Sequence, residues 1–254
     1  MRPTERRQTH LGRVLAAILG LATFAAACGG EEPAPAGPPE GSEAVSFPSS
    51  DGISLEGRIF GDGAVGVVLS HMRPSDQTSW WDLAERLAGE GYLVLTYDFR
   101  GYCPGGSAGC SQGEQDLGMI WRDVLGAVEF IRSRGALQVM LVGASMGGTA
   151  SLMAAAQDGV AVDVVVALSA PAVFEGMVLT PDVLTRVTAA KLFLAGNGDG
   201  SAPDDAQVLY AGSPPPKRVE ILTTDDHGTD ILDGNQSGRA RTLILAYLEQ
   251  YTDG

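Results

Sequence analysis

The stretch that decides the fold is Val139-Met140-Leu141-Val142-Gly143-Ala144-Ser145-Met146-Gly147-Gly148. An apolar run with β-branched residues, typical of a buried parallel strand, leads directly into Gly-x-Ser-x-Gly. The small-residue segment 147–157 predicts a helix that packs closely on this strand. Glycines on both sides of Ser145 permit a sharp strand-to-helix turn that exposes a serine hydroxyl at the sheet edge. The pattern predicts Ser145 as a nucleophile; the alternative is an ordinary glycine-rich turn.

The rest of the chain alternates strand and helix patterns. The predicted strands are 53–60, 65–70, 92–97, 162–168, 191–195 and 219–222. The first of them alternates apolar and polar residues, as an edge strand would. The predicted helices are 80–90, 116–134, 203–210 and 238–251. This alternation predicts an α/β fold with a mostly parallel twisted sheet and helices on both faces. Only a short segment separates Leu168 from Lys191, so we expect a minimal lid and a rather open site.

The first residues have the pattern of an export signal. Four arginines precede an apolar run over 14–27, which is shorter than the roughly 20 residues of a membrane-spanning helix. Residues 1–27 are therefore predicted to be a signal peptide, and the junction that follows resembles the lipoprotein type. Residues 28–45, rich in Pro, Gly and Glu, are predicted to be a flexible tether. Residues 46–254 would form the catalytic domain.

Cys28 lies at the expected cleavage point. The junction Ala25-Ala26-Ala27-Cys28 resembles that of bacterial lipoproteins, although Ala25 stands where Leu is more common. The resemblance implies that Cys28 is acylated and anchors an exported protein to the cell envelope. The alternative is secretion after cleavage near Ala27.

The other two cysteines, Cys103 and Cys110, flank a short Gly-rich loop. In an exported protein this spacing suits a disulfide, and two free thiols are the alternative. Neither a second Cys-x-x-Cys nor a nearby pair of histidines accompanies them, so we expect no metal.

The net charge disfavours nucleic acid as a partner. The whole chain carries −14. Without the four arginines and one glutamate of the signal segment, 13 basic and 30 acidic residues remain, which gives −17. Such a surface repels polyanions.

A serine nucleophile needs a base, and the base needs an acid that orients it. The one histidine after Ser145 is His227, which lies between the last predicted strand and the last predicted helix. Asp199 follows the preceding strand and is the first candidate for the acid. Asp204 and Asp205 are reserve candidates, although both also suit the first turn of a helix. Asp225 and Asp226 rank lower, because neighbours in sequence point away from each other.

The developing oxyanion requires two N–H donors. The amide of Met146, directly after the nucleophile, is the first. The loop His71-Met72-Arg73-Pro74 resembles the His-Gly-x-Pro loop of many α/β-hydrolases, which implies the amide of Arg73 as the second. Met72 departs from that pattern. We expect a structural role for His71, which precedes the nucleophile.

Over residues 47–251 the chain resembles the α/β-hydrolase superfamily, and most closely compact dienelactone-hydrolase-like members and lipoproteins of this fold. The resemblance implies hydrolysis of small-molecule carboxylic esters through an acyl-enzyme, without a cofactor. It also implies that Asp98 and Arg100 form a structural ion pair. The side chains Trp80, Trp81, Tyr102 and Met177 suit either a pocket or the core. A serine peptidase or amidase of the same fold, and a binding protein without turnover, are the alternatives.

Overall fold

The computed structural model describes residues 37–252. The predicted signal peptide, Cys28 and the first part of the expected tether lie outside these residues. Regular structure begins with strand β1 (Glu43–Pro48), slightly ahead of the domain boundary at 46 expected from the sequence. Val45 and Phe47 are buried and alternate with exposed neighbours. One face of β1 therefore packs on the core, as a period of two residues requires.

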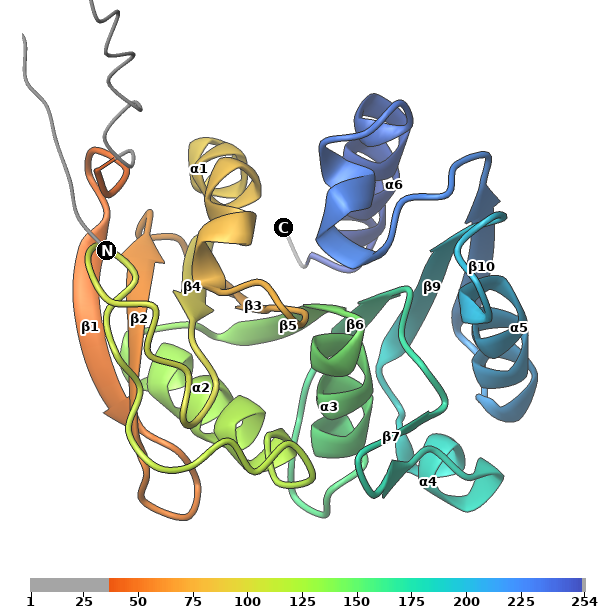
Figure 1. Ribbon diagram of the computed structural model, residues 1–254, viewed down its shortest axis with the longest axis horizontal. Helices are drawn as coiled ribbons and strands as arrows, with labels where there is room; N and C mark the ends of the chain where they lie inside the picture. Colours follow the sequence, from red (N-terminus) through yellow and green to blue (C-terminus); the bar gives the residue numbers. More distant parts are fainter. Residues whose placement is uncertain (1–36, 253–254) are drawn as a thin grey trace, which may run out of the picture. The chain divides into compact units, whose positions relative to one another are not determined.

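An eight-stranded sheet forms the centre of the described domain (Figure 1). Its strands follow the order β1-β2-β4-β3-β5-β6-β9-β10. The pairings of β1 with β2 and of β2 with β4 are antiparallel, and all later pairings are parallel. The further strands are β2 (Ser54–Phe60), β3 (Val65–Ser70), β4 (Leu93–Tyr97), β5 (Gln138–Ala144), β6 (Val164–Leu168), β9 (Ala190–Gly196) and β10 (Lys217–Leu222). The predicted mostly parallel α/β sheet is confirmed.

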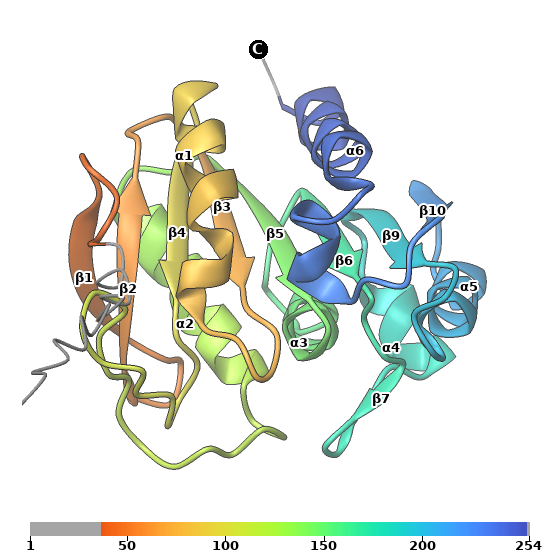
Figure 2. The same ribbon diagram turned by 45° about the horizontal axis from the view of Figure 1, so that its top comes forward.

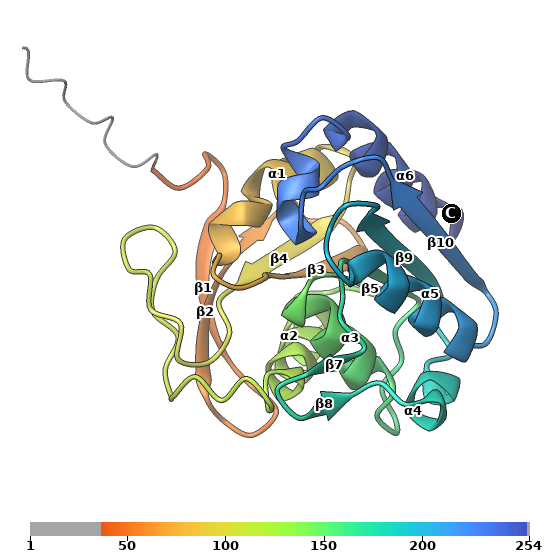
Figure 3. The same cartoon turned by 45° about the vertical axis from the view of Figure 1, so that its right-hand side comes forward.

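Helices cover both faces of this sheet (Figures 1 and 3). One apolar cluster includes side chains of α1 (Trp81–Gly89) and α6 (Ser237–Gln250), and a second includes those of α2 (Trp121–Ser133), α3 (Met146–Ala155) and α5 (Ala202–Gly212). The central strands are thus buried on both faces, which explains their continuous apolar sequences. Within residues 37–252, no helix is both long and apolar enough to cross a membrane.

Short elements fill the segment between β6 and β9. They are β7 (Val173–Phe174), β8 (Met177–Val178) and α4 (Pro181–Arg186). The two strands pair antiparallel and form a hairpin that projects from the domain (Figure 2). Thr180 caps α4 by accepting a hydrogen bond from the amide of Val183, and proline at the first helical position suits the start of a helix. No larger cap is built into this segment, in agreement with the minimal lid predicted from its length.

Two sequence predictions need correction. The strand predicted over 53–60 is β2 (Ser54–Phe60), but it is not the edge strand, because β1 pairs along its outer side. The helix predicted over 116–134 begins only at Trp121. A Cβ at Gly118 would lie 2.7 Å from the carbonyl oxygen of Glu175, so this segment packs tightly against the β7–β8 turn. The periodic apolar residues ahead of α2 thus belong to turns held by tertiary contacts.

A disulfide joins Cys103 to Cys110, as the sequence predicted. Inside the closed loop, the amide of Gly105 donates to the carbonyl of Gly109 at 2.8 Å. The side-chain amide of Gln77 donates to the carbonyl of Ala108 at 2.5 Å. The loop is therefore fixed both by its own covalent closure and by a residue of the loop that follows β3.

Replacing both cysteines by serine is expected to lower the free energy of unfolding by about 2–3 kcal/mol, since the bond restricts a short loop in the unfolded chain. Urea unfolding followed by circular dichroism measures the difference. The variant should still fold, because the loop lies outside both apolar clusters apart from Tyr102 at its edge. An unchanged unfolding midpoint would contradict this expectation.

Candidate active site

Ser145 occupies the turn between β5 and α3. Its backbone has φ 49° and ψ −119°, a conformation that is uncommon for a residue with a side chain. A Cβ at Gly143 would lie 2.3 Å from the carbonyl oxygen of Gly147, and one at Gly147 would lie 2.3 Å from that of Ser70. Only glycine fits at either position. The two glycines thus let the strand and helix approach closely enough to form the turn.

Asp199 and His227 lie in contact. Nδ1 of His227 is 2.9 Å from both Oδ1 and Oδ2 of Asp199. A carboxylate only accepts, so the imidazole carries its proton on Nδ1 and keeps the Nε2 lone pair free to act as a base. The side chain of Asp199 is 12 % exposed and that of His227 is 40 % exposed. The acid is therefore sheltered while the base faces the opening.

These residues lie at one edge of the sheet. Ser145, Asp199 and His227 follow β5, β9 and β10, and the carboxyl ends of parallel strands meet at a common edge. They line one cavity of about 130 Å³. The other residues that line it are Ser169, Pro171, Gly200, Ser201, Ala202 and Asp205. The structure thus brings together the three residues that the sequence predicted as nucleophile, acid and base.

In the described part of the chain, the Ser145 hydroxyl makes no hydrogen bond to the ring of His227. Such bonds are often long without substrate and tighten when it binds. The shared cavity and the His227–Asp199 contact are therefore the geometric basis for the assignment.

The other acidic candidates have different partners. Asp205 lines the cavity, but its oxygens accept hydrogen bonds from the amide of Ala172 and the hydroxyl of Ser201. Asp226 accepts from the hydroxyl of Thr224 at 2.5 Å. Asp204 is exposed at the start of α5. The structure therefore favours Asp199 as the partner of His227.

His71 fixes the loop that carries Arg73. Nδ1 of His71 lies 2.8 Å from the carbonyl oxygen of Met72, and its Nε2 accepts a hydrogen bond from the amide of Phe99 at 3.1 Å. Since a carbonyl can only accept, Nδ1 carries the proton. The Met72 carbonyl and the Arg73 amide belong to the same peptide group. His71 therefore orients the group that contains the predicted second oxyanion donor; the first, the Met146 amide, stands at the start of α3.

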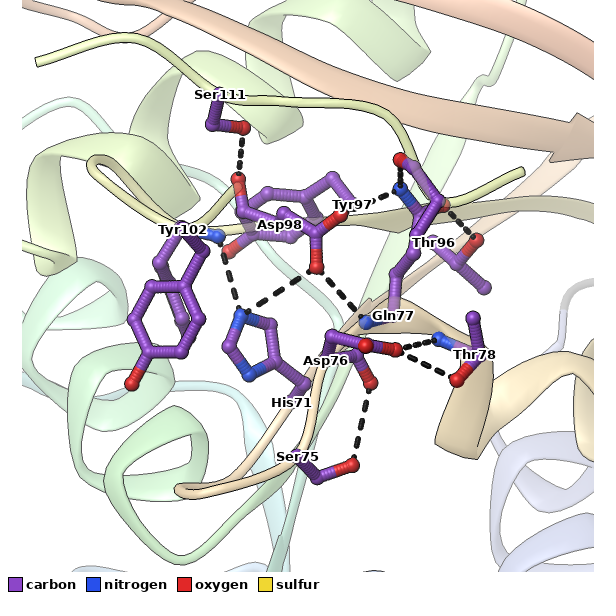
Figure 4. A network of polar contacts seen from close by, with 12 residues as sticks. His71, Ser75, Asp76, Gln77, Thr78, Thr96, Tyr97, Asp98, Tyr102 and Ser111 are labelled. Carbon is purple, nitrogen blue, oxygen red and sulfur yellow. Dashed lines mark hydrogen bonds and ion pairs between the residues drawn. The ribbon is translucent and has the colours of Figure 1, made fainter. Parts of the chain in front are cut away.

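The His71 ring is part of a buried polar network (Figure 4). Burial lowers the pKa of His71 to about 4, so the ring is neutral near pH 7. Burial raises the pKa of neighbouring Asp98 to about 7. The backbone and side-chain amides of Gln77 donate to the two oxygens of Asp98, each at 2.9 Å. The network joins the loop after β3 to the end of β4. Gln77 is not among the residues that the sequence predicted to support the site.

Asp98 and Arg100 do not form the ion pair that the resemblance implied. The guanidinium of Arg100 binds Asp123 at 2.6 Å and Asp51 at 2.7 Å instead. The hydrogen bond from Arg100 lowers the pKa of Asp51 to about 2. The reason is geometric: Asp98 points toward Gln77, whereas Arg100 points toward α2 and the β1–β2 turn. Arg100 still has a structural role, with different partners.

The suggested pocket residues belong to the core. Trp80, Trp81, Tyr102 and Met177 are all buried. Tyr102 packs edge-on against the His71 ring, with centroids 4.6 Å apart. None of the four lines the cavity beside Ser145.

Replacing His71 by alanine is expected to reduce kcat/KM for an ester by about 10²-fold, the usual effect of losing one oxyanion donor. The reason is that the Met72–Arg73 peptide loses the bond that orients it. Steady-state kinetics measure the loss. His71→Asn supplies an amide donor near Nδ1 and should recover part of the activity. Equal kinetics for His71→Ala and the wild type would refute this role.

The family model described as serine aminopeptidase, S33, matches residues 66–199, which is more than half of the chain. The chain belongs to this family. It is an α/β-hydrolase, and its fold is similar to that of dienelactone hydrolase. A comparison with curated proteins gives no significant match.

Solved structures share the fold of this hydrolase. An esterase from Pyrococcus furiosus has a TM-score of 0.69 at 17 % identity, over 84 % of this chain and 93 % of that one. Dienelactone hydrolase from Anabaena variabilis has a TM-score of 0.67 at 21 % identity, over 84 % of this chain and 100 % of the other. An esterase from Thermogutta terrifontis has a TM-score of 0.65 at 18 % identity, over 83 % and 100 %. At these identities the likeness shows the fold alone.

Proposed function

We propose that this hydrolase cleaves carboxylic esters of small molecules through an acyl-enzyme formed on Ser145. The observation that carries the proposal is the contact of His227 with Asp199 in the cavity that Ser145 lines. Family membership supports hydrolysis, and the proteins of similar fold, which include esterases and a dienelactone hydrolase, agree with ester substrates.

In the proposed mechanism, Oγ of Ser145 attacks the ester carbonyl while Nε2 of His227 takes its proton. The amides of Met146 and Arg73 donate to the resulting oxyanion. His227 then returns the proton to the departing alcohol, which leaves an acyl group on Ser145. Water, deprotonated by His227, then attacks the acyl carbonyl; as the bond to Oγ breaks, His227 returns the proton to Oγ of Ser145 and the acid is released. Throughout, Asp199 orients the ring and stabilises its charged form.

A fluorophosphonate probe followed by peptide mapping tests the nucleophile, and a panel of p-nitrophenyl esters tests the reaction. The expected result is one phosphonylated residue, Ser145, together with turnover of short-chain esters. Labelling of another serine, or no turnover of any ester, would overturn the proposal.

The description of the family favours a second candidate, cleavage of an N-terminal residue from a peptide. Aminoacyl p-nitroanilides, assayed beside the matched p-nitrophenyl esters, separate the two functions. The short segment between β6 and β9 argues for the esterase, because it contains only a hairpin and one short helix. Faster turnover of the anilides than of the esters would make the aminopeptidase the better description.

We further propose that the protein acts outside the cytoplasm and is held at the cell envelope by lipid on Cys28. The sequence of the junction supports this placement. The mature protein should partition into detergent, and its N-terminal peptide should carry added lipid mass. Stable anchoring needs more than one acyl chain, so the added mass should correspond to several chains. A soluble protein with an unmodified N-terminus near residue 28 would indicate secretion instead.

A further inference from the structure

Two neighbouring strands are each followed directly by a serine with a positive φ angle. Ala144 of β5 pairs with Leu168 of β6, so Ser145 and Ser169 follow adjacent positions in the sheet. Their φ angles are 49° and 48°. Each amide donates at 2.7 Å to the next strand, Ser145 to Leu168 and Ser169 to Leu194. Ser169 therefore stands beside the proposed nucleophile in the sheet.

Ser169 is 2 % exposed and lines the cavity. Its hydroxyl oxygen accepts a hydrogen bond at 3.1 Å from the amide of Gly228. Gly228 directly follows His227, the proposed base, so this bond fixes the peptide next to the imidazole-bearing residue.

Other contacts enclose the same peptide. Gly228 has φ 55°, and a Cβ there would lie 2.6 Å from the sulfur of Met72 and 3.3 Å from the Cβ of Ala144. The backbone at this point is therefore pressed against the oxyanion loop and the end of β5. Within this packing, the Ser169 hydroxyl is the polar partner of the Gly228 amide.

The position of a half-exposed imidazole depends both on the contacts of the ring and on the backbone that carries it. Asp199 holds the ring at Nδ1, but this bond does not hold the backbone between β10 and α6 that carries the ring. A displacement of about 1 Å at a catalytic group can cost 10²-fold in rate. The bond from the Gly228 amide to Ser169 holds this backbone directly after His227, and the bond from the Asp230 amide to the His227 carbonyl at 3.0 Å adds to it.

We propose that Ser169 is a positioning residue whose hydroxyl holds His227 in reach of Ser145. The inference rests on the proposed function, in which His227 is the base. It assigns Ser169 no covalent role.

The test compares Ser169→Ala, Ser169→Gly and the wild type in p-nitrophenyl ester turnover. Both variants lack the acceptor, but only glycine relieves the cost of the positive φ. We expect kcat to fall about 10- to 100-fold in both, with KM changed less than kcat. The matched control is Ser213→Ala, which removes another buried hydroxyl, one that bonds the carbonyl of Leu209 at the end of α5. This control should keep the wild-type rate.

A second readout does not depend on turnover. We expect the proton in the bond between His227 Nδ1 and Asp199 to give a far-downfield NMR resonance, since a carboxylate acceptor deshields an imidazole N–H proton. We expect it to broaden or disappear in Ser169→Ala and Ser169→Gly and to persist in Ser213→Ala. Wild-type kcat in Ser169→Ala, recovery in Ser169→Gly, or an unchanged resonance in both variants would overturn the proposal.

The two readouts also separate this inference from the proposed function. If the wild type cleaves no ester, the esterase proposal fails while the resonance still tests whether Ser169 positions His227. If the wild type and Ser145→Ala cleave esters equally well, the nucleophile is wrong, and the resonance again decides the role of Ser169.

Discussion

Replacing Ser145 by alanine is expected to reduce kcat/KM for an ester by about 10⁴- to 10⁶-fold, because the acyl-enzyme can no longer form. His227→Ala should cause a loss of similar size, since a serine hydroxyl is a weak nucleophile without its base. The double variant should be no slower than the slower single variant, because nucleophile and base act as one unit. Initial rates over a range of ester concentrations measure all three variants.

Folding controls accompany these rates. Each variant should match the wild type in its circular dichroism spectrum and unfolding midpoint. Fluorophosphonate labelling should vanish in Ser145→Ala and slow greatly in His227→Ala. A double variant far slower than either single one would show that the two residues act independently, against the roles proposed here.

Replacing Asp199 by asparagine is the second large expected effect, a loss of about 10⁴-fold in kcat. The amide cannot stabilise the imidazolium, and it can donate to Nδ1 and so favour the wrong tautomer. Steady-state kinetics near pH 7 measure the loss. Since the side chain is nearly isosteric, the fold should remain.

Asp204→Asn and Asp205→Asn are the matched comparisons for this prediction. Asp204 is exposed at the start of α5, and Asp205 joins that helix to the backbone at Ala172. Their effects should be much smaller than that of Asp199→Asn. The opposite order, mild at Asp199 and severe at Asp205, would transfer the role of the acid.

Strong local patterns made the centre of the fold predictable. The apolar runs of β3 and β5 correspond to strands buried on both faces, and no tertiary information is needed to identify them. The contact of His227 with Asp199 was also predictable, because parallel strands bring their carboxyl ends to one edge. In this fold the base follows the nucleophile and the acid in the chain, and His227 is the one histidine after Ser145.

Other features depend on contacts that the sequence does not encode locally. The hairpin of β7 and β8 has only two residues in each strand, too few to show a period. The partners of Arg100 lie far away in the chain, on α2 and in the β1–β2 turn, so the local Asp-x-Arg-Gly pattern pointed to Asp98 instead. Ser169 had one available signal: like Ser145, it directly follows an apolar strand.

Ser145 and Ser169 follow adjacent strands with similar φ angles, but the chain after each of them differs. Behind Ser145, α3 begins at once, and the partial positive charge at a helix N-terminus favours negative charge near its first residues. Behind Ser169 the chain continues into Ala170, Pro171 and the β7–β8 hairpin, where no such helix field arises. The two serines therefore have similar φ angles but different electrostatic surroundings. Negative charge that develops near these turns is therefore stabilised by a helix N-terminus only at Ser145, which agrees with Ser145, and not Ser169, as the proposed nucleophile.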